Sequence, residues 1–181
     1  NLKPQWMQEF STLFKQIEQT NSTNAKVDAL VRFFRSAPDE DKIWAIALFT
    51  HRRPRRTINT TLLREWAAEI AELPLWHFED SYHVVGDLAE TISLILPNAQ
   101  DTVDKPLSEW IKEMIEIKEH SEEQKKQWVL NAWNFLEKDE RFLFNKLITG
   151  GFRIGVSQRL ITKALARFLE QEENQIAHRL M

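Results

Sequence analysis

Apolar residues recur every three or four positions along almost the whole chain. Phe10, Leu13, Phe14 and Ile17 form one such stripe, and the next runs from Val27 to Phe34. This spacing places the apolar side chains on one face of an α-helix, whereas a half-buried strand alternates with a period of two. No convincing alternating run occurs, and the presence of only one tyrosine also argues against a sheet. The pattern therefore predicts an all-α fold.

Start and stop signals divide the chain into about ten or eleven helices. Asn59, Ser121 and Ser157 have side chains that cap helix N-termini, and Ser121 is followed by a glutamine at capping-box spacing. Gly86 and Gly150 suit the left-handed residue that ends a helix. The expected helices are 6–20, 25–36, 38–50, 60–73, 75–85, 87–96, 107–119, 122–137, 139–149, 157–170 and 172–181.

The size and composition of the chain favour one domain made of two packed lobes. The chain has 181 residues, of which 43% are hydrophobic, enough for a sizeable core. The longest loop runs from Pro97 to Pro106, so we expect lobes at about 7–97 and 106–181. The chain has no cysteine, which excludes disulfides and thiolate metal sites, and no apolar run approaches the ~18 residues of a membrane span. We expect a cytoplasmic protein with no membrane partner.

Basic residues gather in two windows that contain no aspartate or glutamate. Residues 141–167 hold six Lys or Arg and three of the four glycines, and residues 42–64 hold another six Lys or Arg. The rest of the chain has 12 basic residues against 27 acidic ones. Such segregation on an acidic chain is typical of proteins that bind a polyanion, most commonly nucleic acid. A solvated charged face is the alternative interpretation.

The glycine run in the second window has the spacing of a nucleotide phosphate loop but lacks its chemistry. Val156 follows Gly155 where a phosphate loop needs lysine, and the run lies between two predicted helices. The glycines instead leave backbone N–H groups uncovered, Ser157 starts a helix, and Arg153 adds a positive charge. These features indicate an anion site for a phosphate group, and an ordinary turn between two helices is the alternative.

Other residue types offer little catalytic chemistry. The seven tryptophans lie mostly within apolar stripes, which indicates core positions, whereas Phe152 in the glycine run is a candidate for base stacking or insertion. The five histidines lack metal-ligand spacing, and no catalytic triad stands out. Lys26, Asp28 and Ala29 match the nucleotidyltransferase K-x-D-G signature except for its glycine, and we interpret this match as coincidence.

The segment 144–166 resembles the signature of the N-terminal DNA-binding domain of ATP-dependent DNA ligases. In that family a short Arg-[Ile/Leu]-Gly turn joins two helices, as in Arg153 to Gly155 here. Residues 85–91 are similar to the family's second recurrent turn, and the basic run 52–56 followed by 62–67 resembles the bacterial branch. The resemblance covers essentially the whole chain, and we therefore expect a segment of a longer ligase.

The resemblance implies an all-helical domain that binds nicked duplex DNA across the minor groove, without reading the base sequence. The parent ligase would seal nicks in repair, replication or recombination, associated with the nucleoid. Its adenylation and OB-fold domains, on the same polypeptide, would hold ATP, Mg²⁺ and the catalytic lysine. No catalytic residue, cofactor or metal ligand is therefore expected in this segment. An α-helical scaffold that docks an acidic partner is the alternative function.

Two sets of residues are expected to contact DNA. The resemblance assigns this role to Gly150, Gly151, Arg153, Gly155, Ser157, Gly86 and Asp87. The two basic windows add Arg159, Lys163, Arg52, Arg53, Arg55 and Arg56.

Overall fold

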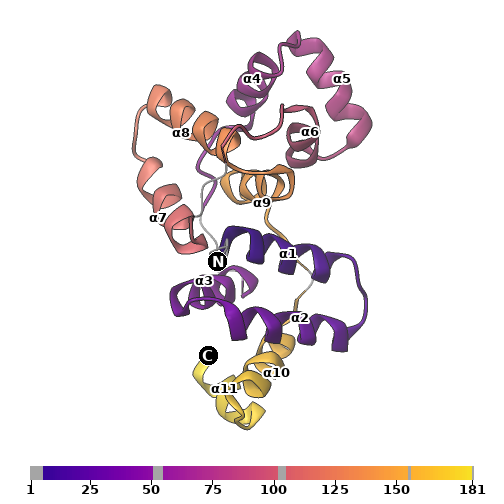
Figure 1. Cartoon of the computed structure of the whole chain (residues 1–181), viewed down its shortest axis with the longest axis vertical. Helices are drawn as coiled ribbons and strands as arrows, with labels where there is room; N and C mark the ends of the chain where they lie inside the picture. Colours follow the sequence, from indigo (N-terminus) through magenta and orange to yellow (C-terminus); the bar gives the residue numbers. More distant parts are fainter. Residues whose placement is uncertain (1–5, 51–54, 102–104, 155, 181) are drawn as a thin grey trace. The chain divides into compact units, whose positions relative to one another are not determined.

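The computed structural model describes residues 6–50, 55–101, 105–154 and 156–180 (Figure 1). These residues form eleven helices and no strand, which confirms the predicted all-α fold. Within the same residues no helix is both long and apolar enough to cross a bilayer. The helices are α1 (Trp6–Glu18), α2 (Thr23–Ser36), α3 (Asp39–Phe49), α4 (Thr60–Ile70), α5 (Leu75–Val85), α6 (Leu88–Ile95), α7 (Leu107–Ile117), α8 (Glu122–Phe135), α9 (Lys138–Ile148), α10 (Gln158–Leu169) and α11 (Glu173–Leu180).

The predicted helix ends have the expected chemistry. Asn59 caps α4 by accepting a hydrogen bond from the backbone N–H of the second helical residue, and Ser121 forms a full capping box on α8. Ser157 caps α10 in the same way. Gly86 and Gly150 have φ values of 84° and 72°, the left-handed conformation that glycine adopts without a steric penalty. Local sequence therefore determines where these helices begin and end.

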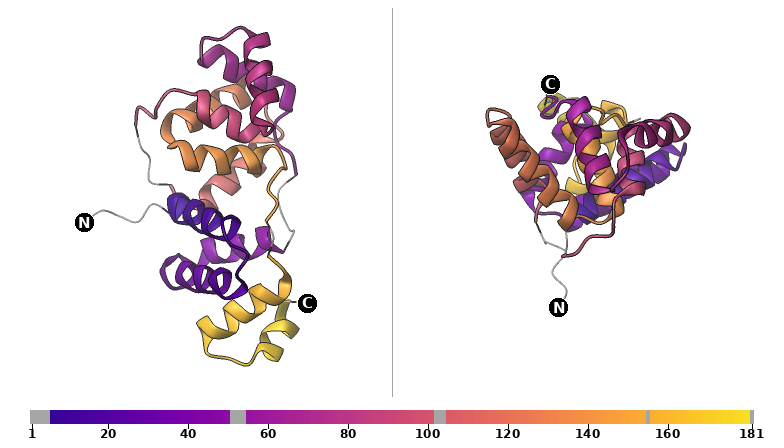
Figure 2. Two further views of the ribbon diagram at one scale, coloured as in Figure 1. Left: turned by 90° about the vertical axis from the view of Figure 1, so that its right-hand side faces the viewer. Right: turned by 90° about the horizontal axis from the view of Figure 1, so that it is seen from above.

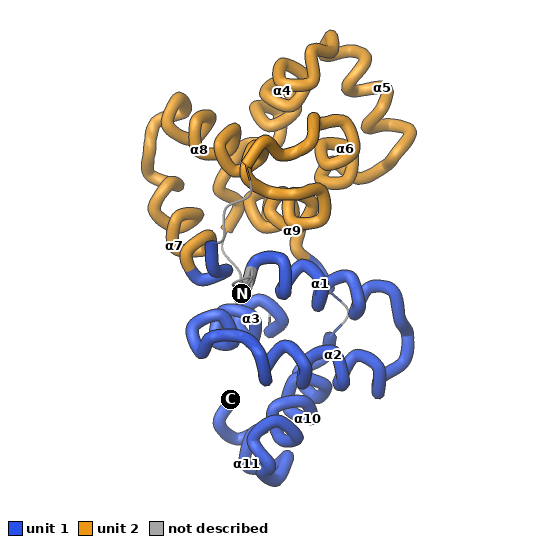
Figure 3. The backbone as a smooth tube through the Cα atoms, in the orientation of Figure 1, with its two compact units in different colours: residues 1–53, 104–108, 153–181 blue, residues 54–103, 109–152 orange. Residues whose placement is uncertain are grey.

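The helices form two compact units, and each unit combines stretches that are distant in sequence (Figure 3). Unit 1 comprises residues 1–53, 104–108 and 153–181, and unit 2 comprises residues 54–103 and 109–152. Sequence analysis predicted two consecutive lobes instead, at 7–97 and 106–181. The units interleave because α10 packs on α2 in unit 1 and α9 packs on α6 in unit 2. Figure 2 shows the C-terminal helices, in yellow, against the indigo helices of unit 1.

The core of unit 1 is built on phenylalanine rings. The ring of Phe10 lies 5.8 Å from that of Phe33 and 5.7 Å from that of Phe49. Phe34 lies 6.0 Å from Phe168, which joins α2 to α10. Rings at these separations add specific edge and offset contacts to the burial of apolar surface. The aromatic stripes of α1, α2 and α3 thus hold this unit together.

Asp41, a fully buried residue in the first turn of α3, connects distant parts of unit 1. Its Oδ1 atom accepts a hydrogen bond of 3.0 Å from the backbone N–H of Ser108. Ser108 lies in the first turn of α7, where backbone N–H groups have no partner within the helix. The carboxylate supplies that partner, and its negative charge interacts favourably with the positive end of the helix dipole. Asp41 therefore fixes the start of α7.

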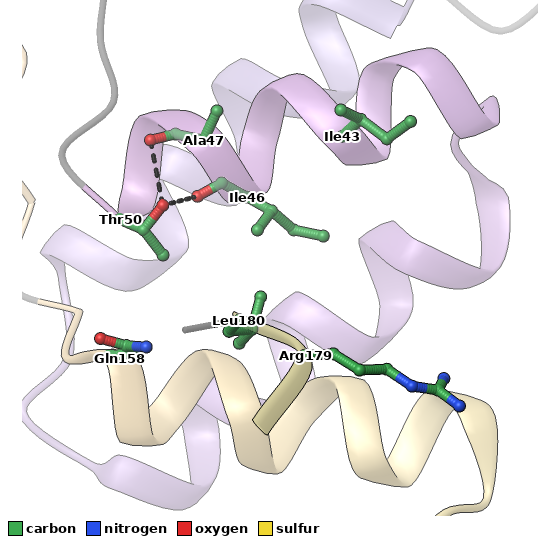
Figure 4. Close-up of a pocket in the computed structure, with 7 residues that line it drawn as sticks. All are labelled: Ile43, Ile46, Ala47, Thr50, Gln158, Arg179 and Leu180. Atoms are coloured by element: carbon green, nitrogen blue, oxygen red, sulfur yellow. Dashed lines mark hydrogen bonds between the residues drawn. The ribbon is translucent and has the colours of Figure 1, made fainter. Parts of the chain in front are cut away.

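Helix α3 has a second apolar face on the opposite side from the core. Ile43, Ile46 and Ala47 line a cavity of about 500 Å³, together with Gln158 of α10 and Leu180 of α11 (Figure 4). The side chain of Ile43 is 65% exposed. Unit 1 thus keeps an open apolar hollow beside its phenylalanine core.

Helix α9 lies at the centre of unit 2. The Trp133 indole N–H donates to Oδ1 of Asn145 at 2.8 Å, and the Nε–H of Arg141 donates to the Trp133 carbonyl at 2.7 Å. The ring of Phe144 lies 5.6 Å from that of Trp110. The polar groups of Trp133, Asn145 and Arg141 are thus hydrogen-bonded although they are buried. They therefore specify how α8 and α9 pack and do not weaken the core.

The core interpretation of the tryptophans is confirmed at three positions and wrong at one. Trp66, Trp110 and Trp133 are each no more than 5% exposed. Trp76, however, is 66% exposed. It lies in the first turn of α5, which directs Phe78 and not Trp76 into the interior.

Glu140, in the first turn of α9, is a carboxyl group buried in unit 2. Its side chain is only 6% exposed, and this burial raises its pKa to about 7. The neighbouring charge of Glu137 raises the pKa further. Burial also lowers the pKa of the adjacent Arg141 guanidinium from its usual value. Near neutral pH, folding therefore favours the uncharged form of Glu140.

We predict that Glu140→Gln removes a pH-dependent cost of folding. The carboxyl pKa is near 4.5 in the unfolded chain and about 7 in the folded chain, so the folded protein binds more protons between these values. Wild-type stability must then fall as pH rises from about 4.5 to about 7, relative to the glutamine variant. Urea unfolding of both proteins at pH 5 and pH 8 measures the divergence. Parallel pH profiles would contradict it, and Glu116→Gln, an exposed change on α7, is the matched control.

Candidate nucleic-acid interface

The C-terminal end of α9 is closed by a glycine turn. The N–H of Gly150 donates to the Leu147 carbonyl at 3.3 Å, and that of Gly151 donates to the Lys146 carbonyl at 2.9 Å. The hydroxyl of Thr149 donates to the Asn145 carbonyl at 2.7 Å. Because the last four carbonyls of a helix lack partners within it, these bonds hold the end of α9 in one conformation.

The basic loop before α4 lies against this same helix end. The N–H groups of Thr57 and Ile58 both donate to the carbonyl of Ile148, at 2.9 and 3.3 Å. Thr57 and Ile58 are buried, whereas Arg55 and Arg56 before them are exposed. The loop is therefore held at its base and presents two guanidinium groups to solvent. The structure confirms, for these residues, that the basic run is a loop held on a folded surface.

The turn at Gly150 lies in van der Waals reach of this loop. A Cβ atom there would lie 3.7 Å from both the Cβ and the backbone nitrogen of Arg56. The space would accommodate a Cβ atom, so it is the left-handed φ of 72° that requires glycine at this position. The two acid-free windows of the sequence meet at this point in unit 2.

The turn between α5 and α6 also joins α9. Gly86 ends α5, and Asp87 caps α6 with its Oδ1 atom, which accepts from the N–H of Glu90 at 2.9 Å. The other carboxylate oxygen of Asp87 forms an ion pair with Nζ of Lys146 on α9. Both side chains are largely buried, at 20% exposure for Lys146 and 33% for Asp87. Asp87 therefore holds the turn in place through two internal contacts.

Three turns thus converge on one end of α9, and we call this arrangement the α9 junction. It consists of the basic loop 55–58, the turn Gly86–Asp87 and the turn Gly150–Gly151. Sequence analysis listed residues from all three turns but missed Lys146, which connects two of them. The only sequence feature that pointed to Lys146 was its place in an acid-free window. Its ion-pair partner, Asp87, lies 59 positions away, so no local pattern could reveal the contact.

The remaining described candidates lie in unit 1, around the start of α10. The Ser157 hydroxyl accepts from the N–H of Leu160 at 3.2 Å, and Arg153 and Arg159 are exposed. Ser157, Arg159 and Lys163 line a cavity of about 420 Å³ together with Thr23 and Glu173. The cavity thus combines two cations and the positive end of a helix with one carboxylate, that of Glu173, so its lining keeps a net positive charge that favours an anion.

Several sequence interpretations are decided by burial or lie outside the described residues. Phe152 is only 1% exposed, so the hypothesis that it stacks on a base or inserts between bases is wrong. Phe152 is one of the largest fully buried side chains of the described residues. Val156 is 4% exposed and lies between helices, which agrees with the absence of a nucleotide phosphate loop. Arg52, Arg53 and Gly155 lie outside the described residues.

The structure offers no sign of a metal centre within its described ranges. Among those residues no three His, Asp or Glu side chains come together in a way that could hold an ion. The lysine of the imperfect K-x-D-G match lies in the interior of α2. The Asp28 of that match is ion-paired with Arg167 on α10 at 2.7 Å, so it has a structural partner.

Exposed arginine side chains and helix N-termini are groups with which proteins contact nucleic-acid phosphates. Comparison with known families agrees. The family model described as DNA ligase N terminus matches residues 7–166. The chain therefore belongs to the family of N-terminal domains of ATP-dependent DNA ligases. No curated protein matches the chain. Its assignment to the bacterial branch of the family stays a prediction.

We predict that Lys146 and Asp87 are energetically coupled. Lys146→Met retains most of the aliphatic stem, and Asp87→Asn retains an oxygen that can cap α6, so each change removes mainly the charge. A double-mutant cycle in urea should give a coupling free energy of about 0.5–1 kcal/mol, because the pair is largely shielded from solvent.

The Lys126–Glu69 pair provides a matched control in the same unit. Its glutamate is 65% exposed, so the same cycle with Lys126→Met and Glu69→Gln should give a smaller coupling. If the Lys146–Asp87 cycle shows no coupling, the two residues do not hold the Gly86–Asp87 turn on α9.

Proposed function

We propose that this domain binds nicked duplex DNA through the sugar-phosphate backbone, independently of base sequence, for the catalytic domains of a DNA ligase. The observation that carries the proposal is the α9 junction, which holds the exposed Arg55 and Arg56 beside the Gly150–Gly151 turn. Membership of the ligase family supplies the expected substrate class.

The chemistry of the α9 junction suits phosphate groups. Guanidinium groups bind phosphate oxygens with two parallel hydrogen bonds. The N–H groups of Gly86, Gly150 and Gly151 already donate to carbonyls of the preceding helices, so the glycines shape the turns and the exposed arginines supply the charge. Lys146 neutralises the carboxylate of Asp87, which would otherwise repel a phosphate. We propose that the backbone of the Gly86–Asp87 turn faces the DNA and that Asp87 itself positions the turn.

The start of α10 supplies a second group of proposed contacts, in unit 1. Arg159 and Lys163 line the cavity at the Ser157 cap, and Arg153 lies exposed just before it. Two cations beside a helix N-terminus fit a single phosphate group. We propose that each unit contributes phosphate contacts of its own and that neither unit reads base edges.

The catalytic chemistry belongs, in this proposal, to other parts of a longer ligase. ATP and Mg²⁺ would bind to the adenylation and OB-fold domains of the same polypeptide, and this domain would be non-catalytic. Sealing of nicks by such an enzyme serves DNA repair, replication or recombination, in the cytoplasm and at the nucleoid.

We predict that binding to a nicked duplex depends steeply on salt. If about five to eight phosphates are contacted, a plot of log K against log salt has a slope of roughly −5 to −7. Arg153→Glu should weaken binding roughly tenfold at every DNA sequence and make the slope shallower by about one. Fluorescence anisotropy on several labelled nicked duplexes over 50–300 mM salt, a range of roughly the physiological order, measures both quantities.

Arg35→Glu is the matched control, because Arg35 is an exposed residue at the opposite end of α2 from Thr23. It should leave both the affinity and the slope almost unchanged. Salt-independent binding, or a loss in Arg153→Glu that varies with DNA sequence, would contradict backbone recognition. Binding to an acidic protein with none to DNA at low salt would favour the scaffold alternative.

A further inference from the structure

Helix α5 exposes a row of large side chains that the DNA-binding proposal does not use. Within this helix only Phe78 is fully buried. Trp76 is 66% exposed, Val84 is 85% exposed, and Leu75 next to Trp76 is 45% exposed. Trp76, Asp80 and Val84 are four residues apart, so they lie along one ridge of the helix. This ridge is the outer face of α5.

The inner side of α5 is fixed to its neighbours without help from this ridge. Phe78 is fully buried, and Glu79 forms an ion pair of 3.5 Å with Arg64 on α4. The guanidinium of Arg64 also lies 5.2 Å from the centre of the Tyr82 ring. The indole of Trp76 lies against the imidazole of His77, with ring centroids 5.4 Å apart. The exposed apolar side chains therefore do not form part of the packing between α4 and α5.

The surroundings of this ridge are strongly acidic. Residues 60–85, which form α4, α5 and the turn between them, contain five Asp or Glu and only one Lys or Arg. Two of the carboxylates have basic partners, Glu79 with Arg64 and Glu69 with Lys126. Glu65, Glu72 and Asp80 are exposed. This charge repels phosphate and attracts Lys and Arg side chains.

We propose that the outer face of α5 docks a protein segment in which an apolar side chain is flanked by Lys or Arg. Exposed tryptophan is the side chain most enriched among residues that dominate binding energy at protein interfaces. Its ring face also attracts cations, and Asp80, one helical turn away, supplies a carboxylate for the same cation. The proposal goes beyond DNA binding and does not depend on it.

The location of Trp76 permits docking while DNA is bound. Trp76 lies in the first turn of α5, and the Gly86–Asp87 turn of the α9 junction follows the last turn of the same helix. At a rise of 1.5 Å per residue, ten residues of helix separate the two positions by about 15 Å. A basic segment held at the Trp76 end of α5 therefore leaves the proposed phosphate contacts free.

The test uses three fluorescein-labelled peptides of 12 residues with the same leucine content and with net charges of +4, 0 and −4. Anisotropy measures their binding to the wild-type domain, to Trp76→Ala and to Asp80→Lys. We expect the cationic peptide to bind the wild type and to lose about tenfold or more in affinity on each variant. Ile115→Ala is the matched control, because Ile115 is a 51% exposed apolar residue on α7, and it should bind as the wild type does.

Three results would overturn the proposal. The cationic peptide could fail to bind the wild type, could bind Trp76→Ala unchanged, or could bind no better than the neutral peptide. Sedimentation velocity adds a further check, because self-association that Trp76→Ala abolishes would assign the face to a second copy of this chain. Thermal unfolding of each variant verifies its fold. Wild-type binding to nicked duplex, measured separately, shows whether the DNA proposal fails independently of this one.

Discussion

The unpaired backbone groups at the C-terminal end of α9 determine how the proposed DNA-binding turns are arranged. A helix end leaves carbonyl groups without partners, and a buried end must find partners elsewhere. Here the carbonyl of Ile148 accepts hydrogen bonds from Thr57 and Ile58, which brings the basic loop to the glycine turn. The ion pair between Lys146 and Asp87 brings a third turn to the same helix. The basic loop and the two glycine turns are thereby held on α9, a largely buried helix of unit 2.

Charge is distributed over the domain according to role. Positive charge concentrates in the basic loop beside α9 and at the start of α10. Negative charge concentrates on α4 and α5, beside the exposed Trp76. In the two proposals, the positive regions attract phosphate groups and the negative region attracts Lys and Arg side chains. A formal net charge of −3 for the chain conceals this separation.

The sequence was sufficient to predict features that depend on neighbouring residues. Helical period, the caps at Asn59 and Ser121, and the positive φ at Gly86 are all local properties, and all are confirmed. Features that depend on residues distant in sequence were not predictable. The Lys146–Asp87 pair spans 59 positions, and each residue has ordinary local chemistry.

Burial of individual aromatic residues was only partly predictable for the same reason. Phe152 looked accessible because it lies in a glycine run, and Trp76 looked buried because it lies in an apolar stripe. The fold reverses both expectations, with Phe152 inside and Trp76 outside. An apolar pattern identifies the helix, but neighbouring helices decide which of its apolar residues they cover.

The central claim is that the three turns of the α9 junction bind DNA as one surface. Backbone amide NMR signals of the ¹⁵N-labelled domain, followed during titration with nicked duplex, test it most directly. The account predicts that the amides of Arg56, Asp87 and Gly151 shift together with a single apparent Kd, while those around Trp76 stay in place. Shifts confined to one turn, or centred on α4 and α5, would contradict it.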